Sequence, residues 1–154
     1  MTAGTIDRLR TPAAAPAETE VRPVMLLTFN VPFSKAAISV AIDAAAETRA
    51  ELVVCDAMSI APSYVAHAAR QWAEQDNREH ARVVAREAQA RGVRVRLVGF
   101  HNPKPVQAAL EVCRDFAVGL LVLGPERNRL GRFSYGRIKR RVRRDAPCLL
   151  WVED

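Results

Sequence analysis

The chain has 154 residues and a mass of 17.0 kDa, and its 49% of hydrophobic and 26% of charged residues exclude a disordered or fibrous protein. No apolar run approaches the roughly 18–20 residues of a membrane-spanning helix, and the first 22 residues lack the apolar part of a secretory signal, so we expect no membrane insertion. The net charge of +6 is concentrated: residues 127–144, the basic segment, hold nine basic residues and no acidic one, whereas the other 14 basic and 17 acidic residues sum to −3.

The first half of the chain predicts a tail, two strands and two helices. Residues 1–22 are rich in Thr, Ala and Pro without hydrophobic periodicity, and we expect a flexible tail there. The apolar run 24–29 predicts a buried strand, after which Ser34 is expected to cap an alanine-rich helix that ends near residue 49. A second apolar run, 52–55, predicts another strand, and residues 63–90 predict a long helix.

The second half continues the alternation of strands and helices. Residues 93–99 alternate apolar and basic side chains, which predicts an edge strand with one buried face. A helix is expected over about 105–116, and the continuously apolar run 120–123 predicts an interior parallel strand. Residues 124–136 contain glycines and arginines and are predicted to form a loop.

A basic helix and a last strand are predicted after that loop. Ile138 and Val142 lie four residues apart on the inner face of this helix, Pro147 ends it, and residues 149–152 predict the fifth strand. Five strands alternating with four helices predict a single α/β domain over residues 23–154. We expect a doubly wound parallel sheet with strand order 3-2-1-4-5 and helices on both faces.

A ligand site is expected where the winding of this sheet reverses, between the first and fourth strands. The loops over residues 29–35 and 124–136 border that crevice. The second loop contains glycines, which let a backbone approach a phosphate, and it leads into a helix whose N-terminus attracts anions. The sequence therefore predicts an anionic ligand such as a nucleotide.

The basic segment has two interpretations that the sequence leaves open. It is either a solvated cationic helix face or part of an anion-binding site. Nucleic acid is the less expected anion, because no aromatic side chains for base stacking interleave with the residues from Arg137 to Arg144.

The cysteines and histidines predict neither a disulfide framework nor a metal site. An odd number of cysteines without a Cys-x-x-Cys pair indicates free, buried thiols in a reducing cytoplasm: Cys55, Cys113 and Cys148. The histidines are too scattered to bind a metal together, and we expect surface or capping roles for them: His67, His80 and His101. No serine-nucleophile or Walker motif occurs, so we do not expect an enzyme. Trp72 is expected to pack a helix rather than to stack on a ligand.

Three short segments carry a likeness to one known family: Val24–Ala37 (VMLLTFNVPFSKAA), Leu120–Gly124 (LLVLG) and Asp145–Val152 (DAPCLLWV). The last has alanine, proline and cysteine before a terminal apolar strand. On these segments the chain, from Pro23 to Val152, resembles a universal stress protein domain with an adenine-nucleotide alpha-hydrolase-like fold. The resemblance implies a cytoplasmic, usually dimeric, non-catalytic domain, of which some members bind ATP or related adenine nucleotides.

The resemblance also implies a nucleotide motif, Gly-x2-Gly-x9-Gly-Ser/Thr after strand four and an aspartate at the end of strand one. Gly124 matches its first glycine, but Arg127 replaces the second, eight residues lead from there to Gly136, and Arg137 replaces the hydroxyl residue. Asn30 stands where the aspartate is expected. These five residues are the candidate nucleotide- or anion-binding residues, and Arg127 either fills the pocket or binds phosphate through its N–H donors.

The resemblance further implies a homodimer in which the last strand pairs with its twofold mate. The predicted interface is Leu149, Leu150, Trp151 and Val152. An edge covered by the chain's own tail is the alternative. The sequence is compatible with two functions. One is a stress-response module whose crevice holds an adenine nucleotide, such as ATP, or another anion. The other is a dimeric adaptor that does not bind ATP and whose partners are proteins.

Overall fold

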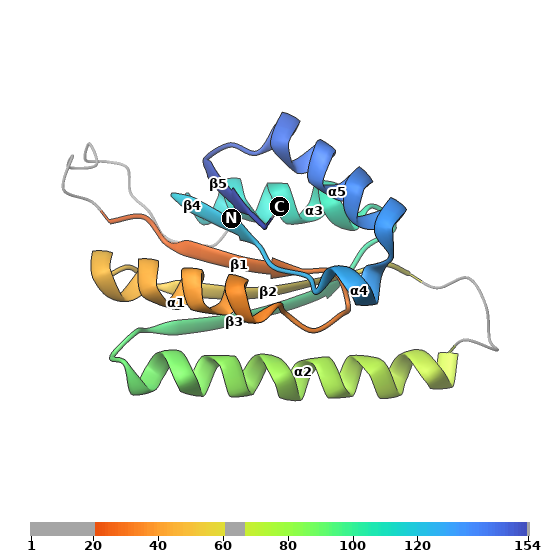
Figure 1. Ribbon diagram of the computed structural model, residues 1–154, viewed down its shortest axis with the longest axis horizontal. Coiled ribbons are helices and arrows are strands. Elements are labelled where there is room, and N and C mark those ends of the chain that lie inside the picture. Colours follow the sequence, from red (N-terminus) through yellow and green to blue (C-terminus); the bar gives the residue numbers. More distant parts are fainter. Residues whose placement is uncertain (1–20, 61–66, 154) are drawn as a thin grey trace.

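The computed structural model describes residues 21–60 and 67–153, and for residues 67–73 the backbone alone. Within them a five-stranded parallel sheet has the order β3-β2-β1-β4-β5, and the predicted fold class and strand order are confirmed (Figure 1). The strands are β1 (Val24–Thr28), β2 (Leu52–Met58), β3 (Val95–His101), β4 (Leu120–Leu123) and β5 (Leu149–Val152). The helices are α1 (Lys35–Thr48), α2 (His67–Ala90), α3 (Pro105–Asp115), α4 (Arg127–Leu130) and α5 (Arg132–Asp145).

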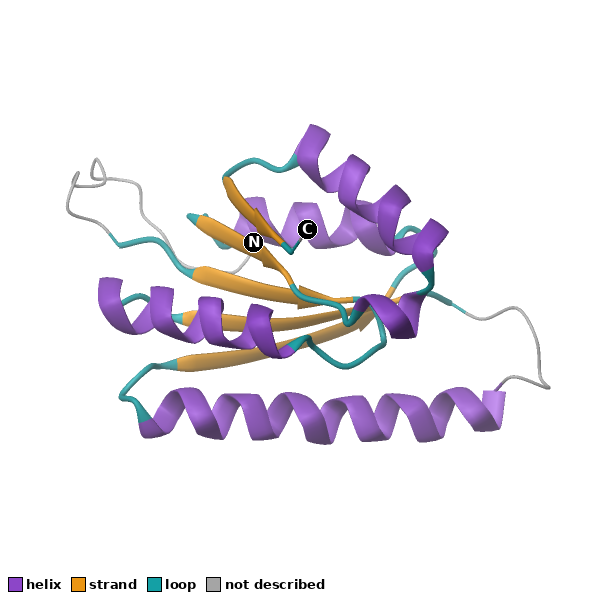
Figure 2. Cartoon of the chain, in the orientation of Figure 1, coloured by secondary structure: helices purple, strands orange, loops and turns teal. Residues whose placement is uncertain are grey.

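Helices cover both faces of the sheet in separate layers (Figure 2). On one face α1 and α2 pack through Ile42 and Ala88 on strand residues such as Val54. On the other face α3 and α5 pack through Leu110 and Val142. All five residues of β1 are buried, because this middle strand has neighbours on both sides and helices above and below it.

Local sequence signals set the helix ends. The Ser34 hydroxyl accepts a hydrogen bond of 3.1 Å from the Ala37 N–H, so the predicted N-cap of α1 is confirmed. The loop predicted over residues 124–136 is wrong, because α4 and the first turn of α5 lie within it. Gly131, with φ of +86°, separates the two helices, whereas Gly136 continues α5. The sequence analysis placed both glycines in one loop, although only Gly131 has a backbone angle that interrupts a helix.

The second and third strands extend further toward the carboxyl edge of the sheet than predicted. β2 continues past Cys55 through Asp56 to Met58, and β3 pairs with it as far as His101. β3 and β5 are the two edge strands within the described residues. The prediction of a flexible tail covers residues 1–22, of which 1–20 lie outside the described residues. The prediction that Trp72 packs a helix concerns a side chain that is also outside the description. Across the described ranges, no helix combines the length and apolar character needed to span a bilayer.

Candidate functional site

The two predicted loops meet where β1 and β4 end. These strands are adjacent and parallel, so their carboxyl ends lie at the same edge of the sheet. The Gly124 N–H donates to the Leu27 carbonyl at 2.8 Å, and the Ser34 N–H donates to the Gly124 carbonyl at 2.8 Å. Phe33 and Pro125 form a further antiparallel bridge between the loops. Backbone hydrogen bonds between the two loops therefore form the floor of the crevice predicted between strands one and four.

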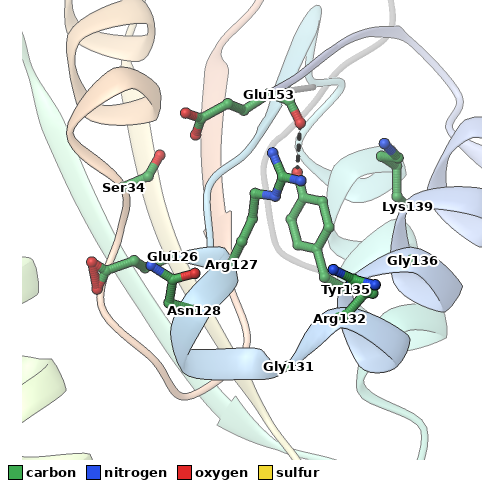
Figure 3. Close-up of a pocket in the computed structure, with 10 residues that line it drawn as sticks. All are labelled: Ser34, Glu126, Arg127, Asn128, Gly131, Arg132, Tyr135, Gly136, Lys139 and Glu153. Atoms are coloured by element: carbon green, nitrogen blue, oxygen red, sulfur yellow. Dashed lines mark hydrogen bonds between the residues drawn. The ribbon is translucent and has the colours of Figure 1, made fainter.

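A pocket of about 720 Å³ opens beside this floor (Figure 3). Its walls come from α4, the first two turns of α5, the start of α1 and the segment after β5. The lining residues are Ser34, Glu126, Arg127, Asn128, Gly131, Arg132, Tyr135, Gly136, Lys139 and Glu153. The lining thus contains three cationic side chains and two carboxylates, and the pocket suits an anionic ligand more than a cationic one.

Tyr135 organises the cationic wall of the pocket. Its side chain is buried, and its hydroxyl donates to the Glu153 carbonyl at 3.1 Å, which ties α5 to the end of the chain (Figure 3). The Arg127 guanidinium carbon lies 5.3 Å from the centre of the Tyr135 ring, and the Lys139 ammonium lies 5.8 Å from it. These cation–π contacts hold two positive groups beside one ring.

The structure separates the five site residues taken from the motif. Arg127 and Gly136 line the pocket, and Arg137 lies exposed on α5 outside the lining. Gly124 is buried: a Cβ there would meet the Leu26 Cδ1 atom at 2.8 Å and the Phe33 Cδ1 atom at 3.0 Å. The lack of a side chain at Gly124 lets the loops after β1 and β4 pack closely.

Asn30 lies at the end of β1 with φ of 59°, a conformation that asparagine tolerates better than most residues. Its N–H donates to the Asp56 carboxylate at 2.7 Å, and its side-chain oxygen accepts from the Asn77 amide at 3.1 Å. Asn77 is buried. Asn30 is therefore engaged by β2 and α2 and is not among the pocket-lining residues.

Asp56 belongs to a polar cluster that sequence reasoning missed. Its pKa is raised to about 6: burial raises it most, the Asn30 N–H lowers it, Glu74 raises it and His101 lowers it. The His101 Nε2 atom lies 3.1 Å from the Glu74 Oε2 atom. The available signal was a carboxylate directly after the apolar run 52–55, where a strand approaches the carboxyl edge of the sheet. In the described part of the chain, no three such side chains are arranged to hold a metal ion.

His80 differs from the expected surface or capping histidine. Its ring stacks on Phe33 with centroids 5.7 Å apart, and its Nε2 atom accepts the Phe33 N–H at 3.2 Å. Burial lowers its pKa. Because the Nε2 atom accepts an N–H, it carries no proton in this contact, and the ring holds the loop after β1 from the side of α2.

The comparison with protein families applies to nearly the whole described domain. Residues 20–152 match the model of the universal stress protein family. The chain belongs to this family. The resemblance noted in the sequence is thus confirmed, although the sequence matches none of the curated proteins with which it was compared.

Solved universal stress proteins share the fold. One from Burkholderia pseudomallei is similar with a TM-score of 0.68 and 16% identity, over 90% of this chain and 98% of that chain. One from Archaeoglobus fulgidus, in complex with dAMP, has a TM-score of 0.61 and 12% identity, over 86% and 97% of the two chains. One from Arabidopsis thaliana, with AMP bound, has a TM-score of 0.57 and 12% identity, over 86% and 90%. At these identities the likeness establishes the fold.

Proposed function

We propose that this universal stress protein is a non-catalytic stress-response protein of the cytoplasm that binds an adenine nucleotide, such as ATP, or another phosphate-bearing anion. The observation that carries the proposal is the pocket at the winding reversal with Arg127, Arg132 and Lys139 in its walls. The dAMP and AMP complexes of two structural neighbours support it. The free cysteine thiols are consistent with a reducing compartment.

The pocket chemistry favours a phosphate group. Arginine offers a planar fork of N–H donors, and lysine adds a compact positive charge. Arg132 opens α5, so the first turn of a 14-residue helix also faces the pocket with its positive dipole end. These groups take the place of the family's glycine-rich phosphate loop, which is degenerate in this chain.

Arg127 acts as a phosphate ligand in this proposal rather than as a plug. Its side chain is exposed and lies against the Tyr135 ring, so it can turn toward a ligand without leaving the hydrophobic core. Lys139 lies beside the same ring and supplies a second charge.

The absence of catalysis is part of the proposal. It rests on the sequence, which contains no serine-nucleophile or Walker motif. We expect incubation with ATP to yield no ADP, as measured by chromatography. Turnover that disappears with Arg127→Ala would contradict this.

Thermal denaturation with ATP, ADP, AMP and cyclic AMP tests ligand binding. A ligand at a hundred times its dissociation constant adds about 2.7 kcal/mol, which raises the unfolding midpoint by roughly 5–10 °C. Arg127→Ala and Lys139→Ala are each expected to weaken binding at least tenfold, about the effect of losing one charge-assisted hydrogen bond. Arg129→Ala is the matched control, because Arg129 is exposed on the same short helix but does not line the pocket.

Three outcomes contradict nucleotide binding in this pocket. No shift with any nucleotide at millimolar concentration would favour the adaptor function. A shift that survives the double variant Arg127→Ala/Lys139→Ala would place the ligand elsewhere. A shift that appears only after Arg127→Ala would make this arginine a plug.

The homodimer is proposed to form through β5. Within the described residues β5 is a sheet edge, its Leu149 side chain is 75% exposed, and Leu150, Trp151 and Val152 are half-buried. Light scattering at micromolar concentration is expected to give twice 17.0 kDa. Leu149→Lys should weaken the dimer at least tenfold, about 1.4 kcal/mol, whereas Leu97→Lys, on the opposite edge strand, should not. A monomeric wild-type chain would contradict the proposal.

A further inference from the structure

The outward face of α5 carries a straight row of side chains that the pocket does not use. The helix packs on the sheet through Tyr135 and Val142, which are buried. Exposed side chains lie on the opposite side of the helix from these two residues. Their spacings of four, three and four residues align them on one face. This row, which we call the cationic crest, consists of Phe133, Arg137, Arg140 and Arg144. All four side chains are exposed, so no described part of the chain covers the crest. The helix that carries it, α5, lies at the margin of the molecule in Figure 1.

Phe133 is the unusual member of the crest. It is 84% exposed, the largest value among the exposed large hydrophobic side chains of the described residues. An aromatic ring so far out of the core adds little to folding, and helices that lie on membrane surfaces combine such rings with basic side chains.

The crest is strongly positive along most of its length. α5 contains seven basic residues and one acidic residue, Asp145, at its last position. Asp145 pairs with Arg144 at 3.1 Å and with Arg141 at 3.5 Å, so the acidic charge of the helix is confined to its C-terminal turn. Arg137 and Arg140 lie between this turn and Phe133. The surface is thus complementary to a dense array of anions.

We propose that the cationic crest docks the protein peripherally on membranes rich in anionic phospholipid. The guanidinium groups contact lipid phosphates, and the Phe133 ring lies at the level of the headgroups, where aromatic side chains are favoured. A single aromatic at one end of a convex helix suits a planar surface. A single-stranded nucleic acid instead requires a groove with successive stacking rings.

Co-sedimentation with phosphatidylcholine vesicles, with and without about 30 mol% phosphatidylglycerol, tests the proposal. The full-length wild-type chain is expected to bind the anionic vesicles at low salt, and to lose at least about tenfold in affinity in neutral vesicles or 0.5 M salt. Arg137→Glu/Arg140→Glu should weaken binding by about 30-fold or more, because each basic residue near an anionic surface contributes roughly fivefold. Phe133→Ala should weaken it about fivefold while the salt dependence remains.

The matched control is Arg78→Glu/Arg94→Glu, which makes the same charge change at exposed positions on α2 and before β3. It should keep most of the wild-type binding. Unchanged thermal midpoints show that the variants fold. Absence of wild-type binding to anionic vesicles at low salt, or equal losses in crest and control variants, would overturn the proposal. Tighter binding to a 20-nucleotide single strand than to vesicles, unaffected by Phe133→Ala, would assign the crest to nucleic acid instead.

Discussion

Gly124→Ala is expected to lower the free energy of unfolding by about 1–3 kcal/mol. A loss of about 3 kcal/mol would lower the thermal midpoint by roughly 5–10 °C. The added Cβ would lie 2.8 Å from the Leu26 Cδ1 atom, 3.0 Å from the Phe33 Cδ1 atom and 3.1 Å from the Leu27 carbonyl oxygen. All three neighbours are buried, and one of the contacted atoms belongs to the backbone, so the clash cannot be relieved by turning a surface side chain. Urea denaturation measures the change.

Gly136→Ala is the matched control for this variant. A Cβ at this position in α5 would have no heavy atom within 4 Å, and alanine favours a helix more than glycine does. We expect the free energy of unfolding to rise by about 0.5–1 kcal/mol. Equal stabilities of wild type and Gly124→Ala would show that the seam between the β1 and β4 loops is looser than the structure describes.

Asp56→Asn is expected to stabilise the protein above pH 7 by up to about 3 kcal/mol, the energy that corresponds to a pKa of about 6 in place of the usual 3.8. A carboxyl group whose pKa is raised in the folded state makes its full contribution to the free energy of unfolding below its pKa in the unfolded chain. That contribution is lost as the pH rises from about 4 through 6. Asparagine removes the buried charge, and its side-chain oxygen can still accept the Asn30 N–H.

Urea denaturation of wild type and Asp56→Asn between pH 4 and pH 8 measures this difference. The two stabilities should converge near pH 4 and separate as the pH rises. His80 has the opposite pH dependence. Its pKa is lowered in the folded state, so its contribution to the free energy of unfolding is lost as the pH falls below 6.5, the usual pKa of histidine. His80 is present in both proteins, so its effect cancels in their difference. Asp76→Asn, at an exposed position on α2, is the control. A pH-independent difference would contradict the buried charge.

The fold was accessible from the sequence because interior parallel strands are buried on both faces. The runs around Leu26, Val53 and Val122 are continuously apolar for that reason, and their alternation with helices leaves few topologies. The carboxyl half of β2 was missed because Asp56 interrupts its apolar run. The Asn30 N–H, which is distant in sequence, donates to this carboxylate, and the Asn77 amide in turn donates to the Asn30 side-chain oxygen.

The sequence predicts at which edge of the sheet the pocket lies, but not which side chains line it. Counting motif residues after β4 pointed to Arg137, on the assumption that the basic helix begins near it. Because α5 begins at Arg132, a helical period of 3.6 residues instead aligns Arg132, Tyr135, Gly136 and Lys139 toward the pocket and turns Arg137 outward.

Local patterns of apolar side chains, capping residues and charge therefore suffice for the strands, most helices, their order and the edge at which a ligand would bind. The direction of each cationic side chain, the contact of Tyr135 with Glu153 and the burial of Asp56 were decided by folding. They depend on the phase of a helix and on contacts between residues up to 47 positions apart. No local window of the chain contains that information.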